Sequence, residues 1–345
     1  MNLFTRLLGL YLLLLGLPLM AQRSLQQRID SLLAAPTTKP FNGIVQIAQN
    51  GRTIYKKSKG YAHYLQQTQL LSKHQFVIGS ISKQFTAVIV LREYDKGHIR
   101  LHTPIGRYLP NLSMPWKDTV TVHQLLTHTH GIVALDKPLA FVAGTKYAYS
   151  QIGYDLLAKI AESTSRKSFA TLSNELFKAC KMYQTFHPDK LPSSERLLKG
   201  FTEQPDGRLV EETETFENYV AAGAFISTAQ DLIIWDTYFF GGKLLQKNTY
   251  KLLTTKQKNA HRAHPIFGPT DYGYGITVDT KDHILQLGQT GFAPGFISMN
   301  FYFPATQTSV VVLDNVVWDS QDLFKTFYYH LQILKAVRQA IGNTN

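Results

Sequence analysis

A serine and a lysine three residues apart are the first groups in this sequence that could carry out chemistry. Ser80 and Lys83 stand in an apolar stretch whose pattern predicts a helix start, so their side chains share one face. Free backbone N–H groups at a helix start stabilise an alkoxide or a developing oxyanion. Burial lowers the pKa of a lysine, and a neutral Lys83 could accept the serine proton. The spacing alone favours a plainer explanation, an N-cap serine followed by a surface lysine. Further motifs along the chain are therefore needed to support a catalytic pair.

Two later segments place polar residues among glycines and aromatic residues. Residues 143–154 contain Tyr149 and Gln151, and residues 287–296 contain Gln289-Thr290-Gly291 in strand-like sequence. A glycine at position 291 suits a strand against which a substrate backbone must lie. Taken alone, Tyr149 is an aromatic residue at a helix start.

Together the three segments resemble the motifs of the serine β-lactamase and penicillin-binding protein superfamily. The similarity is to the branch of class C β-lactamases and D-alanyl-D-alanine carboxypeptidases, whose motifs are Ser-x-x-Lys, Tyr-x-Asn, and Lys-Thr-Gly or His-x-Gly. It covers nearly all of the chain, with supporting segments at residues 125–131, 222–232 and 272–275. The resemblance implies catalytic roles for Ser80, Lys83 and Tyr149, and an oxyanion hole formed by the backbone N–H groups of Ser80 and Phe292. It also implies substrate binding by Gln151, Gln289, Thr290 and Gly291.

The sequence departs from the family pattern at two positions. Gln151 stands where the family has asparagine, and Gln289 stands where it has lysine or histidine. A cation at the second position gives a charge-assisted hydrogen bond to a substrate carboxylate, whereas glutamine offers a neutral donor. We therefore expect either that the substrate lacks a carboxylate at this point or that a nearby arginine binds it.

The order of strand and helix patterns predicts an α/β (α+β) fold. Strand-like runs lie near both ends of the chain, at residues 43–55 around Asn50-Gly51 and from Tyr272 to Leu313. Helical periodicity fills the middle, and Ser227 with Gln230 resembles a capping box before the last middle helix. A long amphipathic helix from Leu323 to Ile341 closes the chain. We expect one antiparallel sheet built from residues 22–78 and 265–345, flanked by helices, with a mostly helical domain, residues 79–264, inserted between its halves.

The first residues have the character of a secretory signal. Arg6 precedes an uncharged apolar run, Leu7 to Leu17, and small residues lead to Gln22. The run is short for a membrane span, which needs about 20 residues. We expect residues 1–21 to be a cleaved signal peptide and the mature protein to lie in the periplasm or outside a bacterial cell. An uncleaved anchor is the alternative.

Charge and composition restrict the partners. The formal net charge is +12, but the basic residues are scattered, and no predicted helix carries a basic stripe with interleaved aromatic residues. Nucleic acid is therefore excluded as an expected partner. Loose attraction to the anionic cell envelope accounts better for the charge.

Metal and thiol chemistry find little support in the sequence. His123, His128 and His130 lie close together, yet no acidic residue joins them on the same stretch and there is no His-Glu-x-x-His motif. Cys180, the single cysteine, ends an amphipathic stretch and is expected to be buried and inert. We expect no cofactor and no metal.

These observations predict a secreted serine hydrolase that forms an acyl-enzyme on Ser80. The resemblance implies small-molecule or cell-wall peptide substrates: β-lactams, D-Ala-D-Ala peptides, or esters and amides. Because Gln151 and Gln289 depart from the pattern, a non-catalytic binder of cell-wall peptides that retains the fold is the alternative. The sequence leaves the oligomeric state open.

Overall fold

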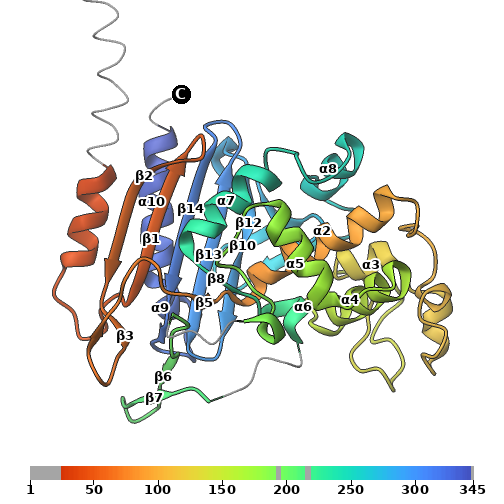
Figure 1. Cartoon of the computed structure of the whole chain (residues 1–345), viewed down its shortest axis with the longest axis horizontal. Helices are drawn as coiled ribbons and strands as arrows, with labels where there is room; N and C mark the ends of the chain where they lie inside the picture. The colour runs from red at the N-terminus through yellow and green to blue at the C-terminus, as the bar shows by residue number, and fades with distance from the viewer. Residues whose placement is uncertain (1–24, 192–195, 214–218, 343–345) are drawn as a thin grey trace, which may run out of the picture.

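A central antiparallel sheet and a helical region beside it make up the computed structural model of the chain (Figure 1). The structure describes residues 25–191, 196–213 and 219–342, so the predicted signal peptide lies outside the described residues. The mixed fold with a large antiparallel sheet confirms the expected fold class.

Eight strands form the main sheet in the order β2-β1-β14-β13-β12-β11-β10-β9, and all neighbours are antiparallel. Segments from both ends of the chain thus meet in one sheet, where β1 pairs with β14. The strands are β1 (Gly43–Gln49), β2 (Arg52–Lys59), β9 (His261–His264), β10 (Gly268–Tyr272), β11 (Thr277–Asp279), β12 (Gln286–Ala293), β13 (Phe296–Phe303) and β14 (Thr308–Asp314).

Smaller sheets and the helices surround this core. The further strands are β3 (Tyr61–His63), β4 (Thr68–Gln69), β5 (Phe76–Val77), β6 (Phe201–Glu203), β7 (Leu209–Glu211), β8 (Ile226–Ser227) and β15 (Val316–Val317). The α-helices are residues 25–34, α2 (Ser82–Asp95), α3 (Val122–Leu126), α4 (Ile152–Ser165), α5 (Phe169–Ala179), α6 (Val220–Gly223), α7 (Ala229–Phe239), α8 (Lys247–Thr254), α9 (Leu323–Thr326) and α10 (Tyr328–Gly342). Short 3-10 helices are η1 (Gly79–Ile81), η2 (Ile105–Arg107), η3 (Pro115–Asp118), η4 (Pro188–Lys190) and η6 (Lys281–His283).

Local sequence explains the sheet. Asn50 and Gly51 both have positive φ angles, 53° and 74°, as a tight hairpin turn between β1 and β2 requires. The strand β14 is buried along its whole length, which fits its Thr-Ser-Val-Val-Val-Leu-Asp sequence and a position covered on both faces.

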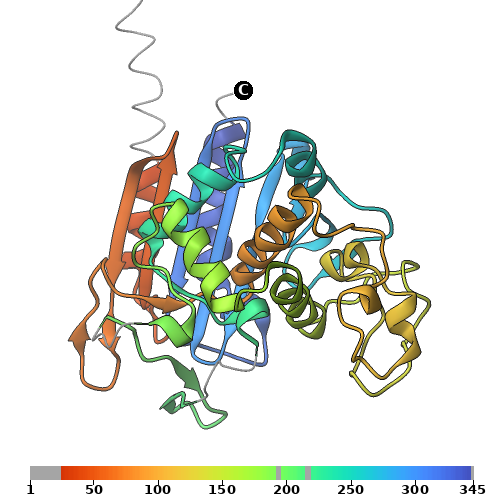
Figure 2. The ribbon, with the colours of Figure 1, turned by 45° about the vertical axis from the view of Figure 1, so that its right-hand side comes forward.

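Helices cover both faces of the sheet. Helix 25–34 and α10 bury one apolar cluster against β1, β13 and β14, and α7 contacts β1 and β14. The helices α2, α4, α5 and α6 pack together beside the sheet, as Figure 2 shows after rotation. The 3-10 helix η1, which leads into α2, lies directly against β12 and β13. This packing brings the Ser80 segment to the face of the strand that carries the third motif.

Two details of the sequence prediction were wrong. Helix α7 is capped by Thr228, whose hydroxyl accepts from Asp231 N at 3.1 Å, because Ser227 lies in β8 and its hydroxyl bonds to Thr185 instead. The closing helix is not continuous. It breaks into α9 and α10 at Phe327, which turns into a small apolar cluster with Ile297 and Val317.

The domain division stays a prediction. Strand β9, at residues 261–264, joins the sheet just before the expected boundary at residue 265. No helix in the described part of the chain is long and apolar enough to cross a membrane.

Candidate active site

Ser80 lies in η1 at the point where the chain enters α2. Its side chain is largely buried, with 9% of the residue exposed. The preceding Gly79 has φ +52°, a left-handed conformation that glycine adopts without strain. This local geometry turns the serine toward β12.

Close backbone approach holds the serine turn against the third motif. A Cβ atom at Gly79 would lie 2.6 Å from Phe292 N, so η1 and β12 touch at this point. From the other side, Gly291 packs against the Ile78 carbonyl, which also accepts a 2.7 Å hydrogen bond from Ser298 Oγ. The backbone N–H groups of Ser80 and Phe292, the predicted oxyanion hole, therefore belong to two segments in direct contact.

Lys83 is fully buried one turn further along α2. Its Nζ donates to Gln151 Oε1 and to the Ala222 carbonyl, both at 2.6 Å, and lies 3.2 Å from Ser80 Oγ. A neutral amine has two N–H donors and one lone pair. If the donors serve the two short bonds, the lone pair is left for the Ser80 hydroxyl, which is the arrangement that a general base needs.

The surroundings of Lys83 favour the neutral amine. Burial lowers its pKa below the ordinary value, and the nearby charge of Arg262 lowers it further, whereas Tyr149 and Asp155 act in the opposite direction. No carboxylate is bonded to Nζ among the described residues.

Tyr149 lies between the Lys83 amine and the Arg262 guanidinium. Lys83 Nζ is 4.7 Å and Arg262 Cζ is 4.6 Å from its ring centroid, and its hydroxyl interacts with Ser80 and Lys83. Burial raises the pKa of the phenol, but the protonated form of Lys83 and the charge of Arg262 outweigh this effect and lower it overall. A phenol in this setting can pass a proton between Ser80 and a leaving group.

His128 fixes the segment that carries Tyr149. Its carbonyl accepts from Ala148 N at 2.8 Å, and its Nδ1 accepts from Ser150 N at 3.2 Å, so both neighbours of Tyr149 are bonded to one residue. Burial lowers the pKa of His128 well below the usual value. No cluster of metal-ligating side chains occurs in the part of the chain that the structure describes.

The Gln289 side chain is turned inward. It is fully buried, its Nε2 donates to the Tyr272 hydroxyl at 3.0 Å, and its Oε1 accepts from Arg262 Nη1 at 3.1 Å. Thr290 is also buried and lies 3.4 Å from His264 Nε2, whereas Gln151 and Phe292 are exposed. In this structure Gln289 contacts Arg262, and its contribution to substrate binding stays a prediction.

The sequence motifs did not identify Arg262. This residue lies on β9, where it pairs with Thr270 on β10. The strands β10 and β11 therefore lie between Arg262 and Gln289 on β12. The missing cation at position 289 was the only signal for an arginine here. The structure places a buried guanidinium beside Gln289.

The profile of the family described as Beta-lactamase matches residues 22–335. The chain belongs to this β-lactamase family. Members of the superfamily are serine hydrolases, among them amidases, esterases and penicillin-binding proteins.

Relatives of this β-lactamase family member cover most of its length. The chain is 25% identical over 301 residues to the putative penicillin-binding protein PbpX of Bacillus subtilis, covering 80% of this chain and 71% of that protein. D-amino acid amidase from Ochrobactrum anthropi SV3 shares the fold at TM-score 0.81 and 20% identity, covering 94% and 99%. EstCE1, a hydrolase with promiscuous acyltransferase activity, shares it at TM-score 0.76 and 19% identity, covering 92% and 99%. These findings confirm the superfamily, while the class C branch stays a prediction.

The contact between η1 and β12 can be tested by substituting Gly79 with alanine. We expect Gly79→Ala to destabilise the protein by about 2–4 kcal/mol, because left-handed backbone strain adds to a clash with β12. Gly97→Ala is the matched control, since Gly97 has φ +81° but nothing within 4 Å of its Cβ position. Its cost should be about 1–2 kcal/mol from strain alone. Urea unfolding measures the loss of stability in both variants. Equal losses in Gly79→Ala and Gly97→Ala would show that η1 and β12 make no close contact at Gly79.

Proposed function

We propose that the protein is a secreted serine hydrolase that forms an acyl-enzyme on Ser80. The observation that carries this proposal is the buried Lys83 amine, 3.2 Å from Ser80 Oγ and held by two acceptors that are not carboxylates. In the proposed reaction, Ser80 Oγ attacks a carbonyl carbon while its proton passes to Lys83. The oxyanion is bound by the N–H groups of Ser80 and Phe292.

Tyr149 completes the proton path. It lies against Lys83 and interacts with Ser80, so it can deliver the proton to the leaving group as the acyl-enzyme forms. Water then releases the acyl group, with the proton moving in the reverse sense. No cofactor takes part in this proposal.

Arg262 bears on the class of substrate. Within the described part of the chain, its side-chain hydrogen bonds use only Nη1, at 3.1 Å to Gln289 and 3.5 Å to Thr277, which leaves other guanidinium donors for a ligand. The family has a cationic residue where this chain has Gln289, and here the Arg262 guanidinium on β9 lies beside that position. We infer that the substrate carries a carboxylate near the scissile bond, as β-lactams and D-Ala-D-Ala peptides do, in preference to neutral esters and amides.

The predicted signal sequence supports secretion to the periplasm or beyond. There, cell-wall peptides and β-lactams are within reach of the enzyme. Loose association with the anionic envelope fits the net charge of +12.

The nucleophile is tested by covalent labelling. Ser80→Ala should abolish labelling by a fluorophosphonate probe, because removal of such a nucleophile costs about a million-fold in turnover. Ser82→Ala is the control and should still label, since the Ser82 hydroxyl is buried and accepts from Phe225 N at 3.2 Å. Mass spectrometry of the labelled wild type should place the adduct on residue 80. Wild-type protein that never labels, while folded, would favour the non-catalytic binder.

Recognition of a carboxylate is tested at Arg262. We compare kcat/KM for a penicillin with kcat/KM for the neutral ester p-nitrophenyl acetate. Arg262→Gln should lower the penicillin-to-ester ratio about five- to tenfold, because a charge-assisted bond exceeds a neutral one by about 1 kcal/mol. Adding Gln289→Lys to Arg262→Gln should restore part of the ratio. An unchanged ratio would refute carboxylate binding, whatever happens to the absolute rates.

A further inference from the structure

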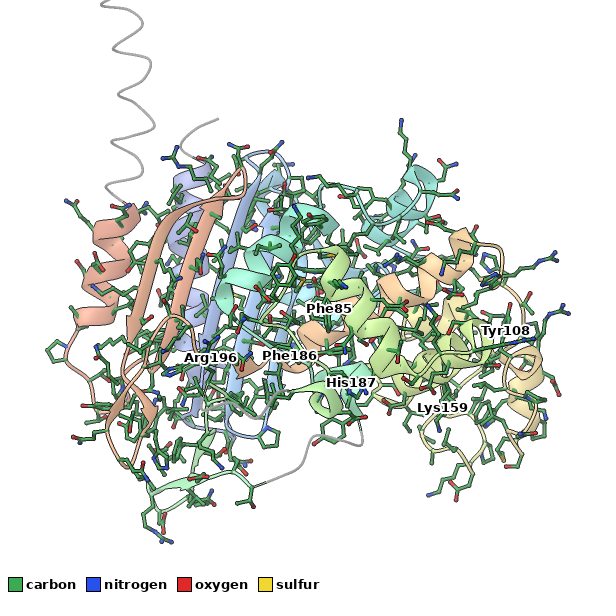
Figure 3. All side chains as sticks on the ribbon, viewed as in Figure 1. Phe85, Tyr108, Lys159, Phe186, His187 and Arg196 are labelled. Carbon is green, nitrogen blue, oxygen red and sulfur yellow. The ribbon has the colours of Figure 1, made fainter. Side chains whose placement is uncertain are left out.

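A groove of about 470 Å³ opens between α4, α6 and the segment around η4, and none of the residues assigned above to catalysis lines it. Two of its lining residues, Lys159 and His187, are labelled in Figure 3. The groove adjoins the site through two segments. Ile152 and Asp155 follow Gln151 on α4, and Val220 and Ala221 precede Ala222, so the groove is lined by the neighbours of both acceptors of Lys83.

The charge of this groove is opposite to that of the protein. Three carboxylates line it, those of Asp155, Glu162 and Asp189, against one cation, Lys159. The chain as a whole has a formal net charge of +12. Apolar side chains, including Leu135, Leu156 and Phe169, form the rest of the wall. Such a surface suits a positively charged group on an aliphatic stem.

Asp155 is the acid nearest to the catalytic residues. Its carboxylate is half-buried and has no hydrogen-bond or ion-pair partner among the described residues. Burial raises its pKa to about 6, while the charges of Lys83 and Lys159 act in the opposite direction. A half-buried carboxylate without a bonded partner is costly in free energy, and a cationic ligand would remove that cost.

His187 adds an independent indication of a ligand. It is 7% exposed and lines the groove, and its Nδ1 accepts from Asp189 N at 3.2 Å. Burial lowers its pKa, which favours the neutral ring. With Nδ1 as acceptor, the proton of a neutral ring is on Nε2, which has no hydrogen-bond partner in the described part of the chain. The largely buried His187 side chain therefore presents an N–H donor beside the carboxylates of the groove.

We propose that this groove binds an ammonium-bearing part of the substrate, with Asp155 and Glu162 facing the ammonium and His187 donating to a neighbouring carbonyl. The inference rests on the proposed function and extends it. Arg262 would bind a carboxylate on the sheet side of Lys83, and the groove would bind an amine on the α4 side. The substrate is then a peptide with an amine at one end and a carboxylate at the other. A metal ion does not fit, because no group of three His, Cys, Asp or Glu side chains that could hold one occurs among the described residues.

The test compares two ligands that differ only in this charge. The Ser80→Ala protein, in the full chain, is titrated calorimetrically with 6-aminohexanoyl-D-alanyl-D-alanine and with its N-acetyl form. We expect the amine to bind about five- to tenfold more tightly, as a charge-assisted bond predicts. Asp155→Asn combined with Glu162→Gln should abolish this preference. Glu175→Gln should keep it, because Glu175 lies on α5, outside the groove, and pairs with Lys167 at 2.7 Å.

The outcomes separate this proposal from the proposed function. Equal affinity for the two ligands, a preference that survives the double substitution, or no binding of either ligand overturns the groove assignment. Fluorophosphonate labelling of Ser80 in the wild type decides the hydrolase separately. Labelling without an amine preference would leave the hydrolase standing and remove only the groove.

Discussion

A buried lysine amine without a carboxylate partner is the constraint on which the site depends. Burying a charge is costly unless it is paired, so a lysine in this position favours the neutral form. Lys83 is held by the Gln151 amide and the Ala222 carbonyl, which are neutral acceptors from two different segments. The elements α4 and α6 must therefore both pack against α2, and their contacts with it are among the most extensive between helices.

The sheet imposes the second condition. The serine turn must lie close enough to β12 for two backbone N–H groups to meet, which requires glycine at both Gly79 and Gly291. β12 is held in place by β13 and β11 on either side. Since β1 and β14 join the two ends of the chain in the same sheet, a local active-site geometry depends on pairing between distant segments.

Much of this arrangement could be predicted from sequence, because its signals are local. Ser80 and Lys83 share a helix face by their spacing, Asn50-Gly51 marks a hairpin, and strand-like apolar runs mark β13 and β14. Arg262 could not be placed, because its approach to Gln289 depends on the registers of β9 to β12. The break at Phe327 was also missed, since the helical periodicity continues through it and only tertiary packing turns the side chain aside.

The most direct test of this account is the pH dependence of acylation in the wild type and in Lys83→Arg. Burial lowers the pKa of Lys83, and only the neutral amine accepts the serine proton. The wild-type acylation rate with p-nitrophenyl acetate, measured by stopped flow, should therefore rise with pH through one ionisation below the ordinary lysine value. Lys83→Arg should remain folded by circular dichroism and show no burst, because a guanidinium stays protonated. A Lys83→Arg protein that acylates at the wild-type rate would contradict the account.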